Sequence, residues 1–164
     1  MTIHDKISDT DTEFFTTYVD TISLVERLHR LLLDVVKDEF ERLGILDINP
    51  VQGVLLFNIA ANEVTAGELR QRGYYLGSNV TYNLKKLVDA GYMHHKKCKV
   101  DRRAVRVSLT DKGIKVRQII QDLFDRHAHD LQERNLIRRE GIFEIASALK
   151  RLERFWGEQI RYIY

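Results

Sequence analysis

Residues 78–109, SNVTYNLKKLVDAGYMHHKKCKVDRRAVRVSL, decide the fold because their hydrophobic pattern changes its period partway along. The first part predicts a helix that Ser78 caps and Gly91 ends, with apolar side chains recurring every three or four residues on one face. Those apolar residues are Val80, Leu84, Leu87 and Val88. The second part predicts strands over 92–98 and 104–109, joined by a short basic turn at 99–103. A helix followed by such a hairpin predicts the second half of a winged helix-turn-helix.

The preceding residues predict the first half of that arrangement. Thr65 and Glu68 have the spacing of a capping box, which begins a short helix reaching about Arg72. The pair Asn49 and Pro50 has the residue types of an N-cap and first helical position, so a helix is expected from Pro50 to near residue 62.

Long amphipathic helices flank this central part. One is expected over residues 13–43 with Gly44 at its end, and two more over 110–133 and 136–162. The predicted fold class is therefore mainly α with a small antiparallel β-hairpin, a winged helix-turn-helix with long N- and C-terminal dimerisation helices. We expect residues 1–46 and 113–164 to form the dimerisation regions and 47–112 the DNA-binding domain, in one compact chain. At the N-terminus up to about 20 residues are expected to be frayed.

The distribution of charge is more informative than the net charge of +2. Residues 1–23 carry five acids and one base, whereas residues 85–106 carry eight bases and two acids. This local excess of positive charge is typical of a surface that binds a polyanion. A solvated, lysine-rich hairpin is the alternative interpretation, and the adjoining helix-turn-helix pattern favours nucleic acid.

The polar face of the helix at 78–89 carries side chains that can read DNA. Asn can pair with adenine, Thr can contact a thymine methyl group, and Lys and Ser can reach phosphates. Arginines at the tip of a hairpin can enter a narrow minor groove. The predicted DNA-binding residues are Ser78, Asn79, Thr81, Tyr82, Asn83, Lys85, Lys86, Lys99, Arg102 and Arg103. A plain amphipathic surface helix is the competing interpretation.

The stretch DRRAVRVSLTDKG at 101–113 resembles the wing signature of the multiple antibiotic resistance regulator (MarR) family. Leu87 and Gly91 match the end of that family's recognition helix. The resemblance implies a homodimeric transcriptional regulator on pseudo-palindromic DNA, with Arg103 as the wing arginine and Asp101 as its supporting carboxylate. Tyr82 stands where the family often has Arg, so no base preference is carried over. The stretch YYLGSNV at 74–80 is similar to a MarR subgroup named for control of an L,D-transpeptidase.

The resemblance also implies a small-molecule pocket where the dimerisation helices meet the winged-helix part. Its candidate lining residues are Phe40, Leu43, Phe57 and Tyr74, although residues of these types are more often plain core. An occupied pocket could change the spacing of two DNA-reading heads if the ligand binds the two states differently.

Helix length predicts the dimer. The first and last helices would be roughly 46 and 40 Å long, which exceeds the core of one small domain, so their apolar stripes need a partner. A second copy related by a two-fold axis is the simplest one. The interface candidates are Phe14, Phe15, Phe155, Trp156 and Tyr164, although packing within one chain would also explain them.

Other classes of function find little support. The chain has no glycine-rich phosphate loop, Gly-x-Ser-x-Gly motif or metal-ligand spacing, so we expect no enzyme, cofactor or metal. The lone cysteine, Cys98, and the absence of a signal peptide or membrane-spanning stretch predict a cytoplasmic protein. Cys98 lies among lysines, so it is either a redox-sensitive thiol or an incidental small residue. The alternative function is a winged-helix protein-interaction module without specific DNA binding.

Overall fold

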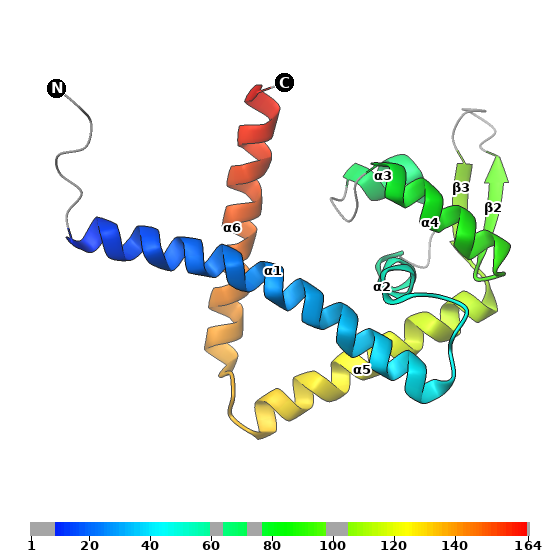
Figure 1. Ribbon diagram of the computed structural model, residues 1–164, viewed down its shortest axis with the longest axis horizontal. Coiled ribbons are helices and arrows are strands. Elements are labelled where there is room, and N and C mark those ends of the chain that lie inside the picture. The colour runs from blue at the N-terminus through cyan, green and yellow to red at the C-terminus, as the bar shows by residue number, and fades with distance from the viewer. Residues whose placement is uncertain (1–8, 60–63, 72–76, 98–104, 164) are drawn as a thin grey trace. The chain divides into compact units, whose positions relative to one another are not determined.

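The computed structural model describes residues 9–59, 64–71, 77–97 and 105–163 (Figure 1). In chain order the elements are α1 (Asp9–Leu43), α2 (Pro50–Asn58), β1 (Val64–Thr65), α3 (Ala66–Gln71), α4 (Gly77–Asp89), β2 (Met93–Lys97), β3 (Val105–Leu109), α5 (Asp111–Glu133) and α6 (Arg139–Ile163). The chain divides into two units, residues 1–120 and 121–164. The predicted class, mainly helical with a small antiparallel element, is confirmed.

Local capping chemistry sets the ends of several helices where the sequence predicts them. The Asn49 side chain accepts a hydrogen bond from the Gln52 backbone, and the Gln52 side chain accepts one from the Asn49 backbone. Thr65 and Glu68 exchange the same pair of bonds at the start of α3. Each cap satisfies backbone N–H groups that have no partner inside the helix. Gly44 and Gly91 follow α1 and α4 with positive φ angles, as expected of residues that end a helix.

Several helix boundaries differ from those predicted. Helix α1 begins at Asp9 instead of residue 13. The second helix ends at Asn58 rather than near residue 62, and Ile59 after it is extended and fully buried. The last helix begins at Arg139 instead of residue 136. The left-handed conformation of Asn135, with φ of 51°, ends the turn after α5 before α6 can begin.

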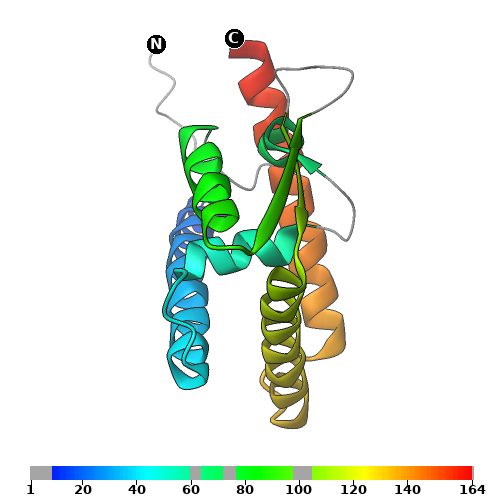
Figure 2. The ribbon, with the colours of Figure 1, turned by 90° about the vertical axis from the view of Figure 1, so that its right-hand side faces the viewer.

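The sheet has three strands in the order β1-β3-β2, all antiparallel, where the sequence predicts a two-stranded hairpin. Strands β2 and β3 pair from Met93 opposite Leu109 to Lys97 opposite Val105; Figure 1 shows them side by side, and Figure 2 shows them nearly edge-on. The additional strand places Val64 opposite Val107. A strand of two residues has no measurable hydrophobic period, so only the tertiary pairing reveals it.

The core of the first unit forms where the elements converge. Helix α1 contributes Val36 and Phe40 from its C-terminal third, where it packs against α2. Gly53 makes that contact close, because a Cβ atom there would lie 2.4 Å from the Phe40 ring. The other fully buried side chains are Leu55, Leu56, Ile59, Leu69, Val80, Leu87, Tyr92 and Ile120. This shared core holds α4 and the sheet as one body.

The second unit consists of the end of α5 and all of α6. A cavity of about 410 Å³ lies at the turn between them, lined by Ala128, Leu131, Gln132, Ile137, Arg139, Ile142 and Phe143. Along α6, large apolar side chains from Ile142 to Ile160 are exposed. In the described part of the chain, no helix is long and apolar enough to cross a membrane.

Candidate nucleic-acid interface

Helix α4 divides cleanly into a buried face and an exposed face. Val80, Leu84 and Leu87 are at most 6% exposed and fix the helix on the core. Six residues on the opposite face are exposed: Asn79, Thr81, Tyr82, Lys85, Lys86 and Asp89. The Lys86 ammonium lies 5.6 Å from the centroid of the Tyr82 ring, so these two side chains form a cation–π pair on the surface. The exposed face therefore offers one amide, two hydroxyls and two ammonium groups, with one carboxylate, Asp89, at the C-terminal end of the helix.

Asn83 does not belong to that exposed face, and this part of the sequence prediction is wrong. Its side chain is 8% exposed and its amide is used inside the molecule, donating to the Asn79 carbonyl at 2.9 Å. It also accepts a bond from Gln52 Nε2 at 3.3 Å. The signal was present in the sequence, because residues 80, 83, 84 and 87 have the i, i+3, i+4, i+7 spacing of a buried face.

Two further predicted residues lie near the start of α4. The helix begins at Gly77, so Ser78 falls inside its first turn rather than before it. The side chain of Ser78 is not among those the structure describes. Its contact with phosphate stays a prediction.

The hairpin also carries exposed polar side chains. His94, His95 and Lys96 on β2 are exposed, and the pairing with β3 gives the strand a fixed register. The tip residues Lys99, Arg102 and Arg103, together with Asp101 and Cys98, lie outside the described residues. Their predicted roles are untested.

Polar contacts tie the corner between α4 and β2 to two other segments. The Tyr92 hydroxyl donates a hydrogen bond at 2.5 Å to the carboxylate of Asp47, which lies on the linker between α1 and α2. The Lys112 ammonium donates to the other Asp47 oxygen at 2.7 Å and to the Ala90 carbonyl at 3.1 Å. It also lies 4.0 Å from the centroid of the Tyr92 ring. The corner is therefore held from both sides by a carboxylate and an ammonium group.

These contacts change the ionisation of all three groups. The hydrogen bond from Lys112, followed by that from the Tyr92 hydroxyl, lowers the pKa of Asp47. Burial raises the pKa of Tyr92, and the bond to Asp47 raises it further. The pKa of Lys112 is raised chiefly by its bond to Asp47. Asp47 and Lys112 are thus held ionised near neutral pH.

Backbone contacts lock the same corner onto α5. The Thr110 backbone donates to the Tyr92 carbonyl at 3.1 Å, and the Thr110 hydroxyl donates to the Gly91 carbonyl at 2.7 Å. That hydroxyl also accepts a hydrogen bond from the Gly113 backbone N–H. This bond caps the N-terminus of α5. A Cβ atom on Gly113 would lie 2.2 Å from the Tyr92 carbonyl oxygen, so only glycine fits this approach. The LTDKG stretch at 109–113 thus carries the contacts that fix the base of the hairpin.

Of the residues predicted to line a ligand pocket, the described ones do not line one common cavity. Phe40 is 2% exposed and borders a cavity of about 210 Å³. The other lining residues are Lys37, Glu41, Ile45, Leu46, Ile48 and Pro50. Leu43 is exposed and Phe57 is half-buried, and neither is among them. Tyr74 is outside the described part of the chain.

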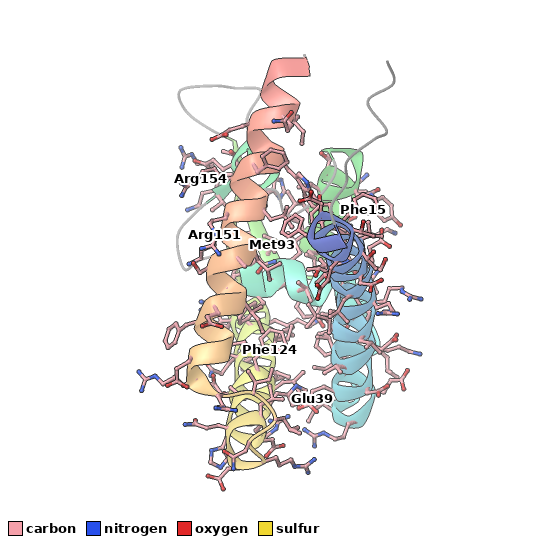
Figure 3. The ribbon with its side chains drawn as sticks, turned by 90° about the vertical axis from the view of Figure 1, so that its left-hand side faces the viewer. Phe15, Glu39, Met93, Phe124, Arg151 and Arg154 are labelled. Carbon is pink, nitrogen blue, oxygen red and sulfur yellow. The ribbon has the colours of Figure 1, made fainter. Side chains whose placement is uncertain are left out.

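Four of the five predicted interface aromatics can be placed. Phe14 and Phe15 are 75% and 65% exposed on α1, and Phe155 and Trp156 are 53% and 41% exposed on α6. Figure 3 labels Phe15 near the start of α1, and shows Arg151 and Arg154 on one side of α6. Tyr164 lies beyond the described residues. These four rings are therefore accessible on the surfaces of α1 and α6.

Residues 48–113 match the winged helix DNA-binding domain family. The exopolysaccharide II synthesis transcriptional activator ExpG of Rhizobium meliloti (strain 1021) is 35% identical over 150 residues, which are 89% of this chain and 75% of that protein. This relative is similar along nearly the whole chain, including the helices on both sides of the winged helix.

Solved structures of low sequence identity share the fold. The MarR protein from Peptoclostridium difficile DA00132 has a TM-score of 0.74 at 19% identity, with 100% of this chain and 97% of that one covered. The transcriptional regulator SlyA has a TM-score of 0.71 at 18% identity, covering 88% and 99%. A mutant MarR from E. coli complexed with operator DNA has a TM-score of 0.66 at 21% identity, covering 84% and 96%.

Proposed function

This chain belongs to the winged-helix transcriptional regulators, and on that premise we propose that it is a regulator of the MarR type that binds a specific double-stranded DNA site as a homodimer. One observation carries the proposal most directly. The exposed face of α4 presents Asn79, Thr81, Tyr82, Lys85 and Lys86 on a helix that Val80, Leu84 and Leu87 hold rigidly on the core. This is the chemistry that reads base edges and phosphates.

The dimensions of α4 suit the major groove. At 13 residues it is roughly 20 Å long, and a helix of ordinary diameter fits a groove about 12 Å wide. In the proposed complex its exposed Asn and Thr side chains contact base edges. Lys85 and Lys86 neutralise phosphates on either side.

The hairpin supplies the second contact in this proposal. Pairing with β3 and the corner contacts of Tyr92 and Lys112 make its base rigid, so side chains carried at its tip lose little freedom on binding. We propose that Arg103 enters the minor groove beside the α4 site and that Asp101 supports it. Lys99 and Arg102 would contact the backbone.

The homodimer is supported by the apolar side chains that α1 and α6 expose. In α1 these run from Phe14 to Leu31, and in α6 from Ile142 to Ile160. Monomeric proteins rarely expose apolar surface in such continuous stretches, and a second copy offers the same stripes in return. A two-fold dimer would place its two recognition helices roughly 34 Å apart, one turn of DNA.

A response to a small molecule is the finer part of the proposal. The cavity beside Phe40 adjoins the linker that carries Asp47, so an occupant there would touch a segment bonded to the base of the hairpin. The test is a thermal-shift screen of small organic acids. Any hit is then repeated on Leu46→Ser, which alters the lining at an exposed position. A hit that Leu46→Ser leaves unchanged places the ligand elsewhere.

Selection of bound duplexes from a random DNA pool tests the main proposal. We expect a consensus with two-fold symmetry and an affinity that falls steeply with salt, because bound phosphates release counterions. Arg103→Ala should weaken binding to the selected site by about 1–3 kcal/mol. The alternative, a protein-interaction module, predicts no consensus and binding that salt hardly changes.

A further inference from the structure

The only polar residue on the buried face of α4 that the structure describes is Asn83. It lies between Val80 and Leu87 in the i, i+3, i+7 row, and roughly 40° around the helix from the exposed Asn79. Its side chain is nevertheless 8% exposed, in contrast to Tyr82 beside it, which is 60% exposed. An amide in this position needs hydrogen-bond partners inside the protein.

Those partners form a continuous chain from α2 to α4. Asn49 holds the Gln52 side chain, because its backbone N–H donates to Gln52 Oε1 at 3.0 Å. The other end of the Gln52 amide, Nε2, donates to Asn83 Oδ1 at 3.3 Å. Asn83 Nδ2 then donates to the Asn79 carbonyl at 2.9 Å, one turn earlier in α4. The capping box of α2 thereby fixes the direction of a hydrogen bond that ends on the recognition helix.

The apolar neighbours cannot provide that directional constraint. Burial of Val80, Leu84 and Leu87 favours contact with the core, but hydrophobic contact is non-directional. Turning α4 by 20° about its own axis would move its surface by roughly 2 Å, given a radius of about 5–6 Å with side chains. A shift of that size breaks a hydrogen bond, whose donor–acceptor distance spans only a few tenths of an ångström. The amide pair therefore restricts rotation that the apolar contacts would tolerate.

We infer that Gln52 and Asn83 form a buried pin that sets the rotation of α4, so that Asn83 determines which bases the exposed side chains meet without itself contacting DNA. The inference rests on the proposed function, since it concerns the orientation in which α4 binds its DNA site. Asn83 is in this sense a positioning residue. Asn79, the same residue type on the exposed face, is the one that reads bases directly.

The test compares the base preferences of variants with those of the wild type. Asn83→Leu keeps a similar volume and removes the amide. We expect it to lower the ratio of specific to nonspecific affinity by about tenfold or more, and to broaden the preference at every base pair that α4 meets. Binding to an unrelated duplex should stay within about twofold, because the lysines are untouched.

Four further variants separate positioning from reading and from folding. Asn79→Ala, the matched control, should change preference at one or two adjacent base pairs only. Asn49→Ala removes the side chain that caps α2 but keeps the backbone N–H that holds Gln52. The pin therefore remains, and the base preference should persist. Gln52→Leu should broaden the preference as Asn83→Leu does, and the double variant should be no worse than either. The double variant has neither of the two buried side-chain amides, so none is left unpaired. It therefore provides the measurement if a single variant fails to fold.

The outcomes are distinguishable from failure of the proposed function. A wild-type protein that selects no sequence removes the proposed function, whatever Asn83 does. A wild type that selects a site, with Asn83→Leu keeping the same preference at all positions, overturns the pin alone. A change in Asn83→Leu confined to one base pair, as in Asn79→Ala, shows instead that Asn83 turns outward and reads DNA.

Discussion

At the scale of single residues, the base of the hairpin depends on a close backbone approach. Gly113 lies in the first turn of α5, directly against the Tyr92 carbonyl, and no side chain fits between them. The motif LTDKG therefore does more than begin a helix. Its threonine, lysine and glycine each contact the corner at residues 90–92.

Gly113→Ala is expected to destabilise the fold. The added Cβ atom would lie 2.2 Å from a backbone oxygen, so α5 or the corner must move, at a cost of about 1–3 kcal/mol in the free energy of unfolding. Urea denaturation measures this. Gly67→Ala is the control, because its Cβ atom would meet only Thr65 Oγ1 at 3.7 Å, and its stability should be equal or slightly higher. If both variants lose the same free energy of unfolding, the close contact between Gly113 and the Tyr92 carbonyl is not the cause.

Asp47 gives the stability of this corner a defined pH dependence. Because the folded protein lowers the pKa of Asp47, the ionised carboxylate stabilises the fold above its unfolded pKa of about 3.9. That contribution disappears as the pH falls through the lower, folded pKa. We expect Asp47→Asn to be less stable than the wild type at pH 7, and the difference to shrink steadily from about pH 5 to pH 2.

Chemical denaturation at several pH values checks this prediction. Tyr92→Phe removes one of the two donors to Asp47 and should reduce the pH-dependent difference without abolishing it. A difference between wild type and Asp47→Asn that is the same at pH 7 and pH 2 shows that the Asp47 contacts contribute nothing through ionisation.

At the scale of elements, α4 shows how a helix can be fixed and still expose a reading surface. Its buried face is mostly apolar, with one amide that pairs with α2. In the proposed complex its exposed lysines contribute to affinity through charge, which is independent of the base sequence. Affinity and specificity are therefore assigned to different residues of the same helix.

Lys86→Ala should change the salt dependence of DNA binding. Loss of one phosphate contact reduces the slope of log affinity against log salt by about 1 and weakens binding to all sequences alike. Fluorescence anisotropy at several salt concentrations measures the slope. Lys37→Ala, which removes a lysine paired with Glu41 on α1, is the control and should leave the slope unchanged. An unaltered slope in Lys86→Ala removes this residue from the interface.

At the scale of the whole molecule, the long helices carry the surfaces through which we propose that two copies associate. The exposed apolar stripes of α1 and α6 need a partner. Because one chain has a mass of 19.3 kDa, the mass of the particle in solution tells whether two chains are associated. Two reading heads on one dimer would also explain the pseudo-palindromic site that the family resemblance implies.

The double variant Phe14→Ser/Phe15→Ser should weaken the dimer. Light scattering at decreasing concentration should show the wild type at twice the chain mass and the variant approaching 19.3 kDa. Leu46→Ser is the matched control, since Leu46 is 79% exposed but lies on the linker between α1 and α2. If the wild type is itself monomeric, or if both variants dissociate alike, the proposed interface is wrong.

Several features could be predicted from the sequence because they depend on neighbouring residues. The capping pairs Asn49 with Gln52 and Thr65 with Glu68 form within one helical turn, and Gly44 and Gly91 end helices where they were expected to. The change of period after Gly91 likewise follows from local alternation. The strand at 64–65 could not be predicted, since its only signal is pairing with residues 106 and 107, which lie 41 and 43 positions from their partners.

What the sequence determined by itself was the order and type of the helices and the hairpin, because periodicity and capping act over three or four residues. Only the tertiary structure decided that Asn83 faces Gln52 rather than solvent, and that Asp47, Tyr92 and Lys112 meet at one corner. The reason is physical: those contacts join residues 31 to 65 positions apart, so they exist only when separate elements pack together.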